Sequence, residues 1–161
     1  MIARAFLAMI CLGIAANVSA APPMRFDAHL TGWNAAGQPV DTNATGQAKV
    51  EIVDDGQAIY FQVEVAGIEG AVMAHIHVNE QPVQVNEPAG PPVYWFFGGP
   101  PPNNPVSDRI NGSLARGYIT SDGDLSGGTV LELVAAIKEG RASIIVHTQQ
   151  NFAGELRGTL R

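Results

Sequence analysis

The 161-residue chain has few charged side chains, 15% of the total, and a single cysteine. Soluble domains typically carry about 25% charged residues. No block of basic residues accompanies the formal net charge of −6, so we expect no electrostatic binding of nucleic acid or of an anionic membrane surface. With one cysteine the chain cannot form an internal disulfide, and its fold must depend on its own core.

Sequence motifs of several common enzyme classes are also missing. The chain has no Gly-x-Ser-x-Gly nucleophile motif, no phosphate-binding Gly-Lys-Thr/Ser loop and no His-Glu-x-x-His zinc motif. These motifs position, respectively, a nucleophilic serine, a bound phosphate and a catalytic zinc ion. Binding is therefore favoured over catalysis, and whether the chain is an enzyme stays open.

Residues 1–20 have the pattern of a secretory signal peptide. Arg4 supplies a positive charge, an apolar run follows over residues 5–16, and Val18-Ser19-Ala20 fits a small-residue cleavage site. The run is too short to span a bilayer comfortably, so we expect no membrane span. The prediction is export to the periplasm or the extracellular space, with residues 21–161 as one mature domain that has lost Cys11.

The mature sequence is predicted to form mostly strands. The 18 glycines and 11 prolines indicate many turns. Apolar and polar residues alternate with the period of two that is typical of half-buried strands; the segments are residues 24–31, 48–52, 59–65, 71–78, 114–120, 142–148 and 155–161. Residues 129–139 instead follow helical spacing. The predicted fold is all-β, an antiparallel Greek-key sandwich or barrel with one short helix.

A long stretch rich in Pro, Gly and Asn covers residues 79–111 and is predicted to be an irregular loop. Long loops in compact domains commonly act as lids or binding loops. Four consecutive aromatic residues lie within it, Tyr94, Trp95, Phe96 and Phe97. Large aromatic side chains favour packing against the domain or contact with a partner, so this segment is the candidate partner-contact surface.

The most informative motif is Ala74-His75-Ile76-His77 in a predicted strand. Residues two apart on a strand point to the same face, so His75 and His77 project together, away from the apolar residues between them. The same parity places His147 on the non-core face of its strand, and His29 on the polar face of residues 24–31. Three convergent imidazoles without a thiolate favour copper or zinc over calcium or magnesium.

A structural role for these histidines is the alternative. Imidazoles also donate and accept hydrogen bonds that could anchor a long loop. A His-x-His pair on a strand is a weak signal by itself, so the metal site stays a hypothesis.

Two charged residues near the C-terminus, Glu155 and Arg157, are two apart and share a face of the last predicted strand. Glu155 could accept a hydrogen bond from a ligand imidazole and orient it, with Arg157 beside it. The alternative is an ion pair between strands, which contributes only about 0–1 kcal/mol when exposed.

Several motifs resemble the CHRD (chordin-type) domain family in their order along the chain. They include Leu30-Thr31-Gly32, Ala74-His75-Ile76-His77, Val146-His147-Thr148 and Gly154-Glu155-Leu156-Arg157-Gly158. The resemblance covers about residues 25–161 and is to single-domain exported bacterial members. The growth-factor binding of animal members is not implied, because no cysteine-rich modules accompany the domain.

A more distant resemblance is to copper–zinc superoxide dismutases, in which His-x-His on a strand and a late Val-Val-His supply copper ligands. This resemblance implies a superoxide-dismutase-like sandwich, an immunoglobulin-like one being the alternative. It also implies copper ligation by His75, His77 and His147, with His29 as a possible fourth ligand, and an Arg157 that guides an anionic substrate. The zinc-binding loop has no counterpart, so the chain resembles a copper-only version, and dismutation is not expected.

Three functions follow as hypotheses. The first is an exported domain that binds a transition metal, copper before zinc, through the three strand histidines. The second is a protein- or glycan-binding module that uses the aromatic residues 94–97, with structural histidines and a protein partner or homodimer. The third is a copper-dependent redox enzyme.

Overall fold

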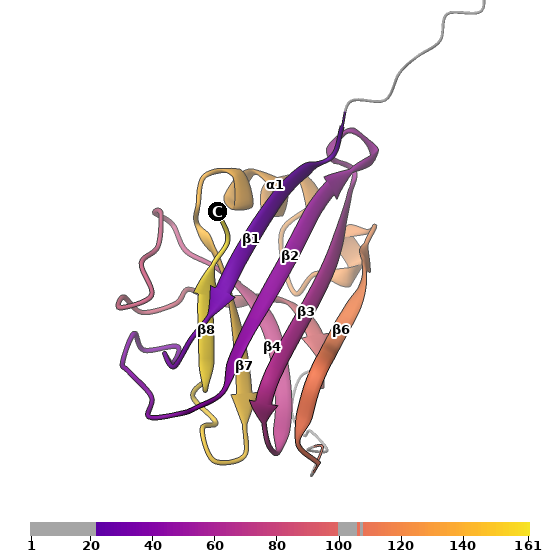
Figure 1. The fold of residues 1–161 in the computed structure, drawn as a ribbon. Helices are drawn as coiled ribbons and strands as arrows, with labels where there is room; N and C mark the ends of the chain where they lie inside the picture. The colour runs from indigo at the N-terminus through magenta and orange to yellow at the C-terminus, as the bar shows by residue number, and fades with distance from the viewer. Residues whose placement is uncertain (1–21, 100–105, 107) are drawn as a thin grey trace, which may run out of the picture.

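The computed structural model describes residues 22–99, 106 and 108–161. The predicted signal peptide therefore lies outside the described residues. Two four-stranded antiparallel sheets make up the domain (Figure 1), with strand orders β1-β2-β3-β6 and β5-β4-β7-β8. The strands are β1 (Met24–Leu30), β2 (Thr45–Val53), β3 (Ala58–Ile68), β4 (Ala71–Val78), β5 (Pro92–Phe97), β6 (Ile110–Ile119), β7 (Ala142–Thr148) and β8 (Leu156–Thr159).

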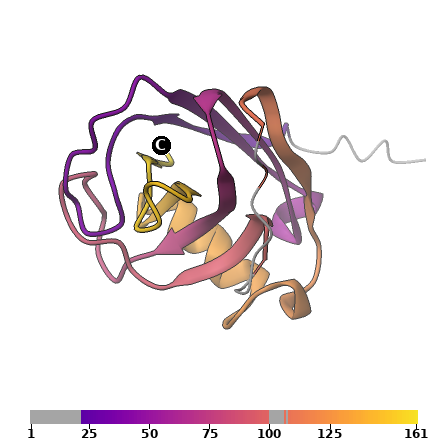
Figure 2. The same ribbon diagram turned by 90° about the horizontal axis from the view of Figure 1, so that it is seen from below.

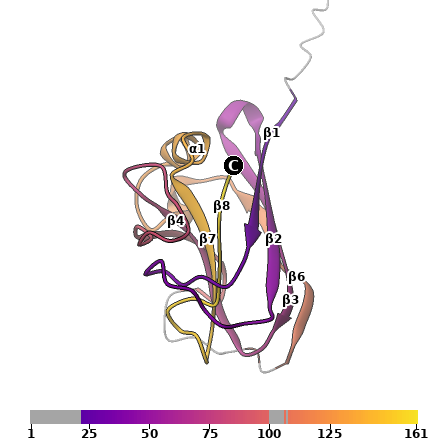
Figure 3. The same ribbon diagram turned by 60° about the vertical axis from the view of Figure 1, so that its left-hand side comes forward.

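The two sheets face each other across one apolar core, with helix α1 (Val130–Lys138) at one end (Figure 3). Alternation along the strands explains this arrangement: in β2, Ala48, Val50 and Ile52 are buried, whereas Lys49 between them is exposed. The chain crosses between sheets so that β6 pairs with β3 and β7 pairs with β4. The predicted all-β sandwich with one short helix is confirmed.

The sheets join at one edge. Asp27 and Arg161 exchange two backbone hydrogen bonds of 2.9 and 3.0 Å, and Thr31 and Arg157 exchange two more of 3.1 and 2.9 Å. These bonds connect β1 to β8 and give the sandwich a barrel-like closure on that side (Figure 2). Among the described residues, no helix is both long and apolar enough to cross a membrane.

Helix α1 forms where helical spacing predicted it. The Thr129 side chain accepts a hydrogen bond from the Glu132 amide, and the Glu132 side chain accepts one from the Thr129 amide, a reciprocal cap for the first turn. Val130, Leu133 and Ile137 are buried against the sandwich. Gly140 follows the helix with φ +69°, a conformation that glycine adopts readily.

The prediction that residues 79–111 form one irregular loop is wrong. Pro92–Phe97 is strand β5, paired antiparallel with β4, and β6 already begins at Ile110. The rings of Tyr94 and Phe96 pack at 5.6 and 4.7 Å from that of Phe61 in the core. Since large apolar side chains occupy both faces of β5, its sequence lacks the alternation that identifies a half-buried strand.

Candidate metal centre

The three strand histidines lie on the face of the β4–β7 pair that points away from the core. Neighbouring residues in the same strands, such as Ala74 and Val146, belong to the core cluster, so the alternating side chains point outward. The predicted parity is therefore correct. The face is nevertheless buried: His75, His77 and His147 are only 4, 5 and 4% exposed.

Three loops shield this outer face from solvent. The Ala35 amide donates to the Ala153 carbonyl at 2.8 Å, and the Ala89 amide donates to the Ala35 carbonyl at 2.7 Å. These two bonds link the loop after β1, the loop between β4 and β5, and the loop between β7 and β8. Figure 3 shows the first two loops on the outer side of the β4 and β7 layer.

The three imidazoles converge. One ligand-capable nitrogen from each of His75, His77 and His147 lies within 4.8 Å of the others. The ring centroid of His75 is 4.6 Å from that of His77 and 4.4 Å from that of His147, so His75 is the central member. The two outer rings are 6.4 Å apart.

Backbone carbonyls fix the tautomers of the two outer histidines. His77 Nδ1 lies 2.7 Å from the Gly90 carbonyl oxygen, and His147 Nδ1 lies 2.9 Å from that of Phe152. A carbonyl oxygen only accepts, so each Nδ1 carries the hydrogen and each Nε2 keeps its lone pair. Within the described part of the chain, both Nε2 atoms are buried without a hydrogen-bond partner, and so is Nδ1 of His75.

The histidines are neutral at neutral pH. Burial lowers the pKa of His75 to about 3 and that of His77 to about 4, and it lowers the pKa of His147 as well. Nearby imidazoles lower the pKa of the first two further, because each would place positive charge beside another. Neutral imidazole is the form that ligates metals, so the Nε2 lone pairs of His77 and His147 and one ring nitrogen of His75 are available to one ion.

His29 does not join this group. It is exposed on β1, in the other sheet, and only the three buried histidines form a cluster of potential ligands within the described part of the chain.

Glu155 supports the loops rather than an imidazole. Its carboxylate accepts hydrogen bonds from the hydroxyls of Thr42 and Thr148, both at 2.7 Å, and from the side-chain amide of Asn151 at 3.2 Å. None of its hydrogen bonds in the described structure goes to a histidine. The carbonyls of Gly90 and Phe152 orient the rings instead.

Arg157 is fully buried and holds two of the shielding loops. Its Nη1 donates to the carbonyls of Asn34, Val85 and Glu87. Its Nε and Nη2 have no hydrogen-bond partner among the described residues. Burial lowers the pKa of Arg157, and Glu87 opposes that effect. The guanidinium stays charged, and its positive charge contributes to the lowered pKa of His77.

The four aromatic residues divide between the two faces of β5. Trp95 lies opposite His75 in the β4–β5 register, and the rings meet edge to face at 5.6 Å. Tyr94, Phe96 and Phe97 pack against the core. Sequence reasoning missed the contributions of Gly90 and Phe152, because their carbonyls act independently of the side chain and leave no residue-type signal.

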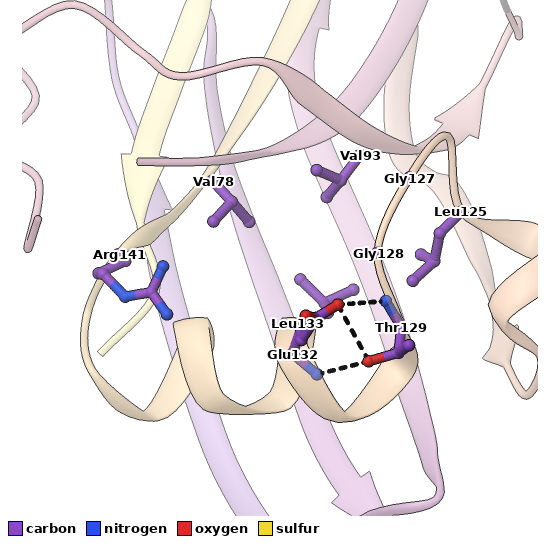
Figure 4. A pocket seen from close by; sticks show the side chains of 9 residues that line it. All are labelled: Val78, Val93, Leu125, Gly127, Gly128, Thr129, Glu132, Leu133 and Arg141. Atoms are coloured by element: carbon purple, nitrogen blue, oxygen red, sulfur yellow. Dashed lines mark hydrogen bonds between the residues drawn. The ribbon is translucent and has the colours of Figure 1, made fainter. Parts of the chain in front are cut away.

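A separate cavity of about 300 Å³ lies between helix α1 and the ends of β4 and β5 (Figure 4). Figure 4 shows apolar side chains along it, with Arg141 at one end and the capped helix start at the other. Its lining consists of Val78, Val93, Leu125, Gly127, Gly128, Thr129, Glu132, Leu133 and Arg141. No histidine lines this cavity among the described residues, so it is distinct from the imidazole cluster.

Comparisons with known proteins agree with the motif order noted above. A family model described as CHRD domain matches residues 26–160, which is most of the chain. No curated protein and no solved structure gives a significant match.

Proposed function

The chain belongs to the CHRD domain family, and we propose that it binds one transition-metal ion, copper in preference to zinc, through His75, His77 and His147. The observation that carries this proposal is the group of three buried imidazoles, each of which offers a ring nitrogen within 4.8 Å of the others. Among the described residues, one ring nitrogen of each imidazole is also buried without a hydrogen-bond partner. Leaving a buried polar atom unpaired costs about 1–3 kcal/mol. A shared metal ion would bind one nitrogen of each ring at once.

The donor chemistry supports copper. Imidazole suits copper, zinc, iron and nickel, and of these metals copper is the one commonly bound as a monovalent ion, whose charge costs least to bury among neutral ligands. The cluster contains no carboxylate, so it is a poor match for calcium or magnesium, which prefer oxygen ligands. Because all three rings are buried, the site is suited to hold an ion and poorly suited to exchange a substrate rapidly with solvent.

The hydrogen bonds on the far side of the rings support the same function. Metal-ligating histidines usually donate their second ring N–H to a carbonyl or carboxylate, which fixes the ring for the ion. His77 and His147 make this bond to Gly90 and Phe152. These bonds hold the two rings in the orientation that leaves Nε2 free for an ion.

Elemental analysis of the purified mature domain after loading with copper tests the proposal. We expect about one equivalent of copper per chain, and loss of that copper in the double variant His75→Ala/His77→Ala. The matched control is His29→Ala, which removes an exposed histidine from the other sheet and should keep the full equivalent. Equal copper uptake by the double variant and the wild type would contradict the assignment.

Thermal unfolding provides a second measurement. A ligand that binds only the folded state stabilises it by about 4 kcal/mol when its free concentration is about 1,000 times Kd. Copper should therefore raise Tm of the wild type and of His29→Ala, but not Tm of the double variant.

We also propose that the domain acts after export. Support comes from Arg4, the apolar run over residues 5–16 and the small residues that end at Ala20. Expression of the full chain with mass analysis of the exported product tests this: the mature protein should begin at Ala21. Recovery of the uncleaved chain only inside the cell would contradict it.

A further inference from the structure

We infer that Met73 supplies a thioether sulfur as a fourth donor to the three-histidine site, which makes the site selective for monovalent copper. This inference rests on the proposed function and adds a ligand and an oxidation-state preference to it. Met73 was not a candidate from sequence, although the strand alternation places it on the same face as His75 and His77.

The strand register places Met73 beside the cluster. It lies directly opposite His147 in the β4–β7 pair and two residues before His75 in β4. Residues directly opposite in an antiparallel pair share a face, with Cβ atoms about 4.5–5.5 Å apart, and so do residues two apart in one strand. Met73 therefore stands on the outward face with His75 and His147.

Burial shows that Met73 is not serving the core. It is 7% exposed, yet it is outside the cluster of buried residues that forms the hydrophobic core, whereas its neighbour Ala74 belongs to that cluster. Ile145, on the same outward face, is likewise buried outside the core. Met73 is thus buried on the same outward face as the histidines. Its unbranched side chain has three rotatable bonds, which gives the sulfur the reach to approach a neighbouring ion.

The charges around the site favour a monovalent ion. Three neutral imidazoles and a thioether carry no negative charge, so the full charge of a bound ion would be buried. Burying charge without compensation is costly, and the cost grows with the charge of the ion. Arg157 adds a fully buried positive charge whose influence reaches His77. Both effects penalise a divalent ion more than a monovalent one, and thioether sulfur is a soft ligand that selects Cu(I).

The test compares Met73→Leu with Met24→Leu. Leucine has a similar volume and no sulfur, and Met24 is 45% exposed on β1 in the other sheet. Cu(I) affinity is measured anaerobically by competition with a chromophoric Cu(I) chelator, and Zn(II) affinity by competition with a zinc dye. We expect Met73→Leu to weaken Cu(I) binding by about 10-fold or more while Zn(II) affinity changes by less than about 3-fold. Met24→Leu should change neither.

A spectroscopic measurement that keeps residue 73 as methionine tests the same contact without the Met73→Leu substitution. The mature chain contains two methionines, Met24 and Met73, so selenomethionine labelling in the Met24→Leu background leaves selenium at Met73 alone. X-ray absorption at the selenium edge of the Cu(I)-loaded protein should show a copper neighbour.

The outcomes separate this inference from the proposed function. One outcome is that the wild type binds copper and the variant His75→Ala/His77→Ala loses it, while no copper–selenium contact is seen and Met73→Leu keeps its Cu(I) affinity. That result overturns the role of Met73 alone. Copper uptake that is unaffected by the double histidine variant overturns both.

Discussion

Acidification should destabilise the metal-free domain well before its carboxylates titrate. In the folded state burial holds the pKa of His75 at about 3 and that of His77 at about 4, whereas an unfolded chain restores about 6.5. Between these values the unfolded state binds more protons than the folded state. The free energy of unfolding therefore falls as pH drops below about 6.5 and continues to fall until pH reaches the folded pKa values.

The magnitude follows from linkage. Each proton taken up only by the unfolded state lowers stability by about 1.4 kcal/mol per pH unit. From pH 7 to pH 5 each of the two histidines loses about 1.8 kcal/mol, or about 3–4 kcal/mol together. His147, whose pKa burial also lowers, changes stability in the same direction. Such a loss is a large part of the about 5–15 kcal/mol that stabilises a typical domain.

Urea unfolding of the metal-free protein at pH 7 and pH 5, followed by tryptophan fluorescence, measures this loss. The variant His75→Gln/His77→Gln removes both titrating groups and should lose most of the pH dependence. The control His29→Gln alters an exposed imidazole and should keep it. If the wild type and the double variant lose equal stability between the two pH values, the assignment of these imidazoles as neutral and buried is refuted.

Three further substitutions and one control, Gly127→Ala, test the scaffold around the site. Arg157→Met removes the Nη1 donor to three loop carbonyls and should lower the free energy of unfolding in urea by about 3 kcal/mol. Gly90→Ala should lower both Tm and copper affinity, because a Cβ there would overlap the Val78 carbonyl, while Gly127→Ala meets open space and should alter neither. Glu155→Gln should cost about 1–3 kcal/mol in urea and leave copper stoichiometry at one.

Periodicity predicted the strands that carry the site. The predicted ranges 71–78 and 142–148 match β4 and β7, because their neighbours on both sides are turns and their core-facing residues alternate with the histidines. The same parity placed His75, His77 and His147 on one face. Side-chain direction along a strand depends only on the backbone repeat, so this part of the site was accessible from sequence.

The alternation of side-chain direction within one strand could not show which strands become neighbours in a sheet. His29 also points away from the core of its strand, yet β1 pairs with β2 and belongs to the opposite sheet. Nor could sequence show that loops bury the outward face, because this depends on backbone bonds such as that between Ala35 and Ala153. Strand β5 was missed because Trp95 and its neighbours cover both of its faces with apolar surface.

The distribution of unpaired polar atoms supports the proposed ligand site over a purely structural use of the histidines. Seven buried side-chain nitrogen or oxygen atoms have no partner in the described structure, and all belong to strands of the β5-β4-β7-β8 sheet. They are His75 Nδ1, His77 Nε2, Trp95 Nε1, Ser143 Oγ, His147 Nε2, and Nε and Nη2 of Arg157. Buried polar groups are normally hydrogen-bonded, and unpaired ones are scattered and few. If the imidazoles only anchored loops, one bond from each outer ring to Gly90 or Phe152 would complete their role, and the nitrogens facing inward would have no reason to converge. Their convergence beneath the linked loops concentrates an energetic cost at one place, and the proposed metal ion would remove the share of that cost that belongs to the imidazoles.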